Sequence, residues 1–148
     1  MGLNKYDLVA GDKLTTFEFV SVGVNGNIEK LIQYSSASYK NIYNLGFGDK
    51  NPVTGKLDDK IISNNGDSEK VLATVVESLY LFTNNNPEAL IYATGSTKSR
   101  TRLYQIGITK FIDKAKTDFI IYGQLENEWY FFEKGINYDA FLVKRIKK

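Results

Sequence analysis

Hydrophobic and polar residues alternate in the first part of the chain and predict a β-hairpin. Residues 17–24 and 27–34 both have a period of two, and Asn25-Gly26 between them is the dipeptide most typical of a type I′ turn. A loop of two residues would fix the register and pair Phe19 with Ile32. The face that we expect to be buried carries the side chains of Phe17, Phe19, Ile28, Ile32 and Tyr34.

The same pattern predicts further short strands along the rest of the chain. They are residues 42–47, residues 56–63, residues 89–94, a second hairpin of residues 119–125 and 129–132, and a last strand at residues 138–146. The nearly continuous apolar run at residues 89–94 is typical of a strand that is buried on both faces.

Two segments have the period of an amphipathic helix. Residues 64–67 supply a turn and an N-cap for the first helix, at residues 68–83, whose apolar side chains share one face: Val71, Leu72, Val75, Val76, Leu79 and Phe82. The second helix is predicted at residues 98–116. Its inner side carries Leu103, Tyr104, Gly107, Ile108, Phe111 and Ala115, and its solvent side carries Lys98, Arg102, Gln105 and Thr109.

The order of these elements is strands, helix, strand, helix, strands. We therefore predict an α+β fold in which a mostly antiparallel β-sheet has two α-helices packed on one face. No repeat, low-complexity tract or long linker divides the sequence, so residues 1–148 are expected to form a single domain.

The composition is that of a globular protein, with 43% hydrophobic and 24% charged residues. The chain has no cysteine and no histidine, which excludes disulfides, cysteine nucleophiles and every catalytic or metal site that needs a thiolate or an imidazole. Asp58 and Asp59 point to opposite faces of a predicted strand and are not spaced as metal ligands. We therefore expect neither a metal nor a cofactor.

The N-terminal residues have no apolar segment like that of a signal peptide, and no apolar run approaches the roughly 18 residues of a membrane span. The expected location is the cytoplasm, with no membrane partner. The net charge of +2 argues neither for nor against nucleic acid.

The best candidate site is the strand-to-helix turn at residues 94–102. A buried strand ends there, a glycine turns the chain, and hydroxyl residues open a helix that carries three cations in its first turns. Unpaired N–H groups and the positive dipole end make a helix N-terminus favourable for anions. Neither a Walker A loop nor a G-x-G-x-x-G fingerprint is matched. The residues predicted to bind a ligand are Gly95, Ser96, Thr97, Lys98, Ser99, Arg100, Arg102 and Tyr104.

Arg100 decides how this turn is interpreted. It projects to the same side of the helix as the apolar stripe, where a cation needs a partner. That partner is either a phosphate or carboxylate of a ligand, or an Asp or Glu of the protein. Residues 64–68 also precede a helix and form a second candidate for an anion site, although a turn and a cap explain them.

Aromatic residues make up 14% of the chain, and aromatic rings on a protein surface can bind nucleic acid by stacking on its bases. Residues 45–49 match the RNP1 core only in Gly46-Phe47-Gly48, and Asp49 stands where an aromatic residue should. Most rings alternate along strands, as core filling requires. The basic residues 144–148 are interpreted as a solvated tail.

Six segments, residues 42–49, 62–75, 92–97, 100–104, 133–138 and 141–143, resemble a family of uncharacterised bacterial proteins of about this length, classed as a domain of unknown function. The resemblance implies a bacterial cytosolic protein with a single domain. It implies no activity, and it identifies no catalytic residue.

Three functions fit these observations. The favoured one is a binding or regulatory module that recognises a phosphate-bearing small molecule, such as a nucleotide, or RNA at residues 95–102. The second is a protein-interaction domain whose exposed strand or aromatic surface pairs with a partner or with a second copy as a homo-oligomer. The third is a small metal-independent ribonuclease of the toxin type that uses Arg100, Arg102, Tyr104 and Tyr92, although no general base stands out. Whether the protein is an enzyme stays open.

Overall fold

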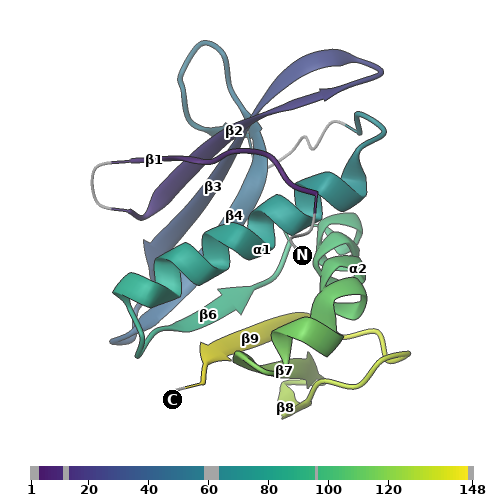
Figure 1. The fold of residues 1–148 in the computed structure, drawn as a ribbon. Coiled ribbons are helices and arrows are strands. Elements are labelled where there is room, and N and C mark those ends of the chain that lie inside the picture. The colour runs from purple at the N-terminus through teal and green to yellow at the C-terminus, as the bar shows by residue number, and fades with distance from the viewer. Residues whose placement is uncertain (1–3, 12–13, 59–63, 96, 147–148) are drawn as a thin grey trace. The chain divides into compact units, whose positions relative to one another are not determined.

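The computed structural model describes residues 4–11, 14–58, 64–95 and 97–146 of the 148-residue chain (Figure 1). The helices are α1 (Ser68–Asn85) and α2 (Lys98–Ala115). The strands are β1 (Val9–Ala10), β2 (Thr16–Gly23), β3 (Gly26–Ser36), β4 (Ile42–Lys50), β5 (Leu57–Asp58), β6 (Leu90–Ala93), β7 (Phe119–Leu125), β8 (Glu128–Phe131) and β9 (Ala140–Arg145). Within the described ranges, neither helix combines the length and the apolar character that a membrane span needs.

Hydrogen bonds join the strands in the order β1-β2-β3-β4-β6-β9-β7-β8, and β5 pairs with β4. The pairing of β4 with β6 is parallel, and the chain that connects these two strands includes α1, as a parallel crossover requires. The predicted α+β class, with two helices and a large, mostly antiparallel sheet, is confirmed.

Residue contacts group the chain into two compact units. The first comprises Met1–Ser35 and Gly46–Asn85 and contains α1, and the second comprises Ser36–Leu45 and Asn86–Lys148 and contains α2. The prediction that residues 1–148 form a single domain stays a prediction.

In the first unit, the hairpin of β2 and β3 forms with a register that differs from the predicted one. Gly23 pairs with Gly26, which makes Val24 and Asn25 the two turn residues, so the predicted turn at Asn25-Gly26 is wrong. The shift in pairing is two residues, an even number, so the same face of the hairpin stays buried. The buried side chains of this face include Phe17, Phe19, Ile32 and Tyr34.

Asn65 explains the shifted turn, because it binds the hairpin tip from the segment before α1. Its Nδ2 donates to the carbonyl oxygen of Gly26 at 2.8 Å, and its Oδ1 accepts the N–H of Asn25 at 2.6 Å. A side chain at Gly23 would collide with the carbonyl oxygen of Asn65, so this close approach requires glycine. A contact between residues 40 positions apart therefore overrides the local turn signal.

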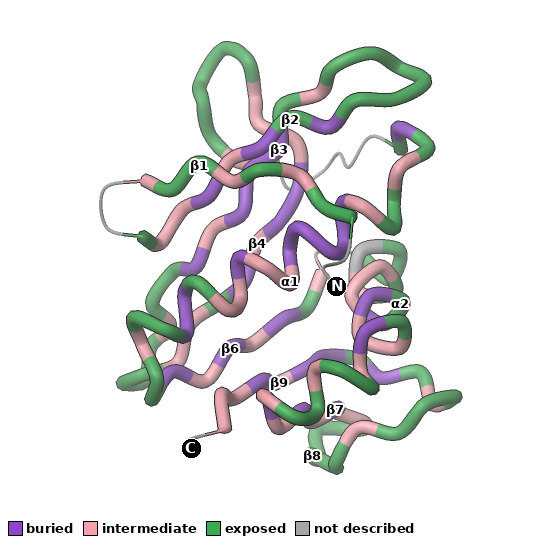
Figure 2. Tube along the Cα trace, viewed as in Figure 1, coloured by how far each residue is buried: buried purple, intermediate pink, exposed green. Residues whose placement is uncertain are grey.

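The apolar stripe of α1 packs against β3 in the first unit. The ring of Tyr34 on β3 stacks on Phe82 with a centroid distance of 4.2 Å, and its hydroxyl group shares a hydrogen bond of 2.8 Å with Ser78. Figure 2 shows buried positions recurring along α1 and along β2, β3 and β4. The predicted helix is confirmed, and it runs to Asn85 instead of ending at residue 83.

One charged side chain lies in this core. Lys30 is 1% exposed and stands opposite Phe19 in the hairpin. Its Nζ lies 2.5 Å from Oδ1 of Asp49 on β4, which supplies the counter-charge that a buried cation needs. Lys30 lies between Ile28 and Ile32 on the face that was predicted to be buried, but the sequence analysis did not single it out.

In the second unit, β6, β9, β7 and β8 are successive neighbours. Alternate residues of β6, β7 and β9 are buried on one face: Ile91, Ala93, Phe119, Ile121, Phe141 and Val143. Leu90 and Tyr92, which point to the other face of β6, are only half-buried. The prediction that residues 89–94 form a strand buried on both faces is therefore wrong, because the side chains on the second face of β6 are only half-buried.

The hairpin of β7 and β8 has the type I′ geometry that was predicted for the first hairpin. Leu125 pairs with Glu128, and the two residues between them, Glu126 and Asn127, have φ angles of 51° and 68°. Two consecutive left-handed residues define this turn type. The predicted second hairpin is confirmed, although its turn contains no glycine.

Candidate functional site

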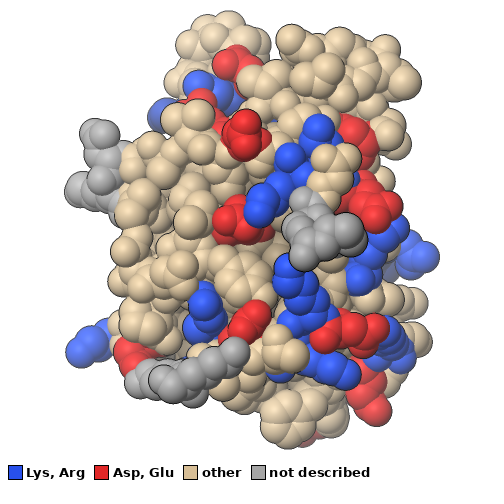
Figure 3. Space-filling view, in the orientation of Figure 1, with Lys and Arg blue, Asp and Glu red and all other residues tan. Residues whose placement is uncertain are grey.

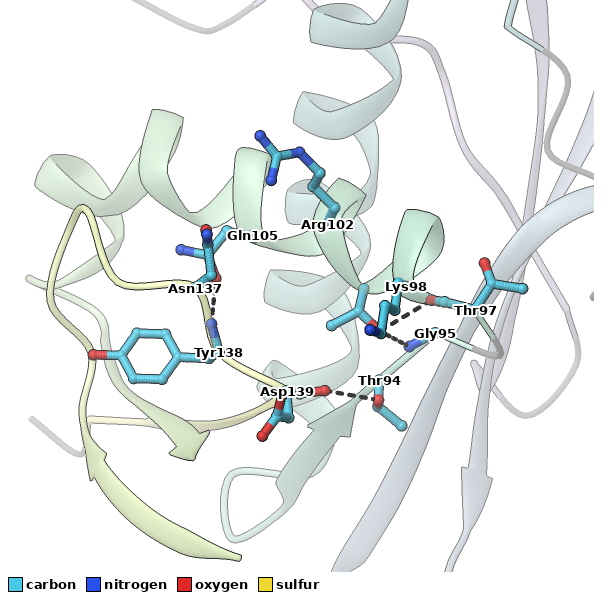
Figure 4. A pocket seen from close by; sticks show the side chains of 10 residues that line it. Thr94, Gly95, Thr97, Lys98, Arg102, Gln105, Asn137, Tyr138 and Asp139 are labelled. Atoms are coloured by element: carbon cyan, nitrogen blue, oxygen red, sulfur yellow. Dashed lines mark hydrogen bonds between the residues drawn. The ribbon is translucent and has the colours of Figure 1, made fainter. Parts of the chain in front are cut away.

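An open pocket of about 540 Å³ lies in the second unit where β6 ends and α2 begins (Figure 4). One wall is the strand-to-helix turn with the first two turns of α2, and the other wall is the loop that precedes β9. The first wall contributes Thr94, Gly95, Thr97, Lys98, Thr101 and Arg102. The second contributes Asn137, Tyr138 and Asp139, and Gln105 lies between the two.

Thr101 ties the turn to the first turn of α2. Its Oγ1 accepts the N–H of Gly95 at 3.0 Å and donates to the carbonyl oxygen of Thr97 at 3.2 Å. The backbone N–H of Thr101 also donates to this carbonyl, which makes Thr97 the N-cap residue. Within the turn, Thr101 therefore already satisfies the backbone N–H of Gly95. Lys98, which carries the first N–H group without an acceptor inside the helix, lines the pocket.

Gln105 fastens the second wall to α2. Its Nε2 donates to the carbonyl oxygen of Ile136 at 2.8 Å, and its Oε1 accepts the N–H of Tyr138 at 3.1 Å. Gln105 is 8% exposed, so the prediction that it lies on the solvent side of the helix is wrong. The loop at residues 136–139 covers it, because the buried backbone groups of that loop need a hydrogen-bonding partner.

Two more contacts fix the position of this loop. Thr94 Oγ1 donates to the carbonyl oxygen of Asp139 at 3.1 Å, and the N–H of Asp139 donates to the carbonyl oxygen of Gln124 at 2.8 Å. The ring of Tyr138 lies against Gly123, where any side chain would collide with it. Contacts with β6, β7 and α2 therefore hold the loop that forms the second wall of the pocket in place.

Lys98 and Arg102, both exposed, are the cations among the described side chains that line the pocket. Among the described residues, neither Lys98 nor Arg102 has a carboxylate within ion-pair distance. Figure 3 shows Lys and Arg side chains gathered over α2, with carboxylates among them. Asp139 places one carboxylate in the opposite wall of the pocket. An anion at the start of α2 would gain from both cations and from the helix dipole, and Asp139 would accept a hydrogen bond from a donor group of the same ligand.

The structure brings together half of the eight residues that the sequence predicted. Gly95, Thr97, Lys98 and Arg102 line the pocket. Ser99 is exposed and does not line it, and the hydroxyl group of Tyr104 donates to the carbonyl oxygen of Leu45 at 3.4 Å. Ser96 and the side chain of Arg100 lie outside the described part of the chain.

Sequence reasoning missed the second wall of the pocket. Asn137 and Asp139 lie more than 30 residues after the predicted turn, and two polar residues before a strand carry no signal that identifies their neighbours. Tyr92, considered for a ribonuclease, packs against Trp129 at a ring-centroid distance of 6.1 Å and does not line the pocket with Arg102.

The second candidate for an anion site, residues 64–68, has another role in the structure. Asn65 binds the hairpin tip, and Oδ2 of Asp67 accepts hydrogen bonds of 2.5 Å from the hydroxyl groups of Tyr6 and Ser21. Burial, together with the hydrogen bond to Asp67, raises the pKa of Tyr6. These contacts stabilise the first unit, and the carboxylate of Asp67 would repel an anion.

No three carboxylates of the described residues come together in a way that could hold a metal ion.

A family model described as a family of unknown function, DUF6934, matches residues 2–146. The chain belongs to this family. The family-level resemblance seen in the sequence is confirmed. Because the match spans nearly the whole chain, it includes every residue that lines the pocket of this DUF6934 protein. No curated protein and no solved structure matches the chain.

Proposed function

We propose that this DUF6934 protein is a binding or regulatory module that recognises a phosphate-bearing ligand, a nucleotide or RNA, in the pocket between α2 and the loop before β9. One observation carries the proposal. Lys98 and Arg102 line an open pocket at the start of a helix, and no ion pair within the described residues neutralises them.

The two walls of the pocket carry different polar groups, which restricts the class of ligand that fits. A phosphate group at the start of α2 accepts hydrogen bonds from N–H groups of the first helical turn and is attracted by Lys98 and Arg102. Asp139 and Asn137 on the opposite wall favour a ligand that also carries hydroxyl or amino donors. Nucleotides have both kinds of group. The proposal places this activity in a bacterial cytoplasm, the setting that the family resemblance implies.

An amide NMR titration of the labelled protein tests the proposal. Inorganic phosphate, a mixture of nucleotides and a short RNA are added separately at low salt, because salt screens exposed charges. We expect the amide signals of residues 97–102 and 137–139 to shift and saturate. The ligand with the lowest Kd then identifies the ligand class.

Two lysines of α2 provide matched variants. Lys98→Ala removes a cation from the pocket, and Lys114→Ala removes an exposed cation from the last turn of the same helix. An exposed ion pair contributes up to about 1 kcal/mol, so Lys98→Ala should raise the Kd by about fivefold and Lys114→Ala should leave it within a factor of two. Equal effects of the two changes, or no saturable shift with any ligand, would refute the pocket as an anion site.

A further inference from the structure

The outward face of the sheet in the second unit carries an uncovered group of aromatic side chains. The register places Tyr122 on β7 beside Phe131 on β8 and beside Leu142 on β9, and Leu142 pairs in turn with Tyr92 on β6. Trp129 lies two residues from Phe131 on β8 and therefore points to the same face. We call Tyr92, Tyr122, Trp129, Phe131 and Leu142 the aromatic platform.

The rings of the platform are exposed to different degrees. Phe131 is 69% exposed and Trp129 is 39% exposed, while Tyr92 and Tyr122 are half-buried beneath them. Phe131 stacks on Tyr122 at a centroid distance of 5.3 Å, and Trp129 packs edge-on against Tyr92. The inner rings thus contact the outer two, and Trp129 and Phe131 are open to solvent. An exposed patch of this kind marks a site of interaction.

The polar residues of this face point to an anionic partner. Lys144 lies on β9 between Leu90 and Ile120, and within the described chain its amine has no ion pair. No Asp or Glu stands at an outward position of β6, β7, β8 or β9, all of which the structure describes in full. Glu128 pairs with Leu125 and binds the hydroxyl group of Tyr130 on the other side of β8.

We propose that the aromatic platform binds a single-stranded nucleic acid by stacking its bases on Trp129 and Phe131. Aromatic rings on a sheet bind unpaired bases of any sequence, because every base has a flat π-face. Lys144 supplies positive charge for the phosphate backbone, and the side-chain amide of Gln124, opposite Trp129 in the register, faces the same surface and can hydrogen-bond to a base edge. The proposal does not rest on the pocket at α2, which is built from other residues.

Trp129 makes the test direct, because it is the only tryptophan in the chain. The full-length protein is titrated with a 12-nucleotide single strand of mixed sequence, as RNA and as DNA, while Trp129 fluorescence is recorded. A 12-base-pair duplex serves as the comparison. We expect saturable quenching with the single strands and at least tenfold weaker binding of the duplex, whose bases are already stacked.

Neighbouring residues of β8 provide a matched pair of variants. Phe131→Ala removes an outward ring, and Tyr130→Ala removes an exposed ring that points to the other side of the same strand. Phe131→Ala should raise the Kd for the single strand at least about fivefold, the loss expected for one stacked base, while Tyr130→Ala should change it less than twofold. Lys144→Ala should reduce the slope of log Kobs against log salt by about 0.7, the value for one phosphate contact on a single strand.

Three outcomes would overturn the proposal. One is the absence of quenching with every oligonucleotide. Another is loss of binding in Lys98→Ala but not in Phe131→Ala, which would place the nucleic acid in the pocket at α2. The third is a concentration-dependent dimer, seen by light scattering, that Phe131→Ala abolishes, because the platform would then be an interface between two copies of this chain.

Discussion

Asn65 lies against Gly26 at the tip of the β2–β3 hairpin, where its Nδ2 donates a hydrogen bond of 2.8 Å to the glycine carbonyl oxygen. The same amide group donates to Oγ of Ser21 at 3.1 Å, and Asn65 is 1% exposed. A buried amide with partners on both strands selects one register of the hairpin and disfavours the other, because any other pairing leaves these groups without hydrogen bonds.

The first prediction concerns this residue. Asn65→Ala should lower the free energy of unfolding by about 2–3 kcal/mol, because it leaves the carbonyl oxygen of Gly26 and the N–H of Asn25 without their partner. The urea midpoint measures the change. Asn64→Ala is the control, since Asn64 is exposed and its side chain accepts only the local N–H of Gly66 in the described structure. If the two variants are equally stable, Asn65 does not hold the hairpin.

The buried ion pair of Lys30 and Asp49 gives the second prediction. Asp49→Ala should destabilise the protein by about 3 kcal/mol, because it removes a carboxylate that lies 2.5 Å from the charge of a side chain that is 1% exposed. The double variant Asp49→Ala with Lys30→Met also removes the buried positive charge and should recover at least half of that loss. A double-mutant cycle by urea denaturation measures the coupling, and additive effects of the two changes would contradict a direct pair.

Tyr6 gives a prediction about pH. Burial, together with the hydrogen bond to Asp67, raises the pKa of Tyr6 in the folded protein above its ordinary value of about 10. The unfolded chain therefore loses this proton first as the pH rises. The contribution of Tyr6 to stability is fully present below pH 10 and falls as the pH passes through the raised pKa.

Tyr6→Phe isolates this effect from the nine other tyrosines. The variant should be less stable than the native chain by about 1 kcal/mol at pH 8, the usual net contribution of one hydrogen bond. The difference should shrink as the pH rises above 10 and passes through the raised pKa, as measured by urea midpoints at a series of pH values. A difference that stays constant with pH would mean that folding does not change the pKa of Tyr6.

The sequence by itself determined both helices and most of the strands, although it did not predict β1. The stripes at residues 68–83 and 98–116 became α1 and α2, and residues 119–125 became β7 with the predicted bounds. These patterns are local, because a period of 3.6 or of two residues follows from backbone geometry and from the need to bury one face. For the same reason the sequence located one wall of the pocket, at Gly95, Thr97, Lys98 and Arg102.

Only the tertiary structure decided how these segments meet. The turn of the first hairpin depends on Asn65, and the second wall of the pocket depends on the hydrogen bonds of Gln105. The exposure of Trp129 and Phe131 depends on how the second unit packs around its sheet. Each of these features joins residues that lie far apart in the sequence. Periodicity shows which side of an element is apolar. It does not show which distant groups hydrogen-bond to a buried amide or cover a sheet, because those contacts form only when the chain packs.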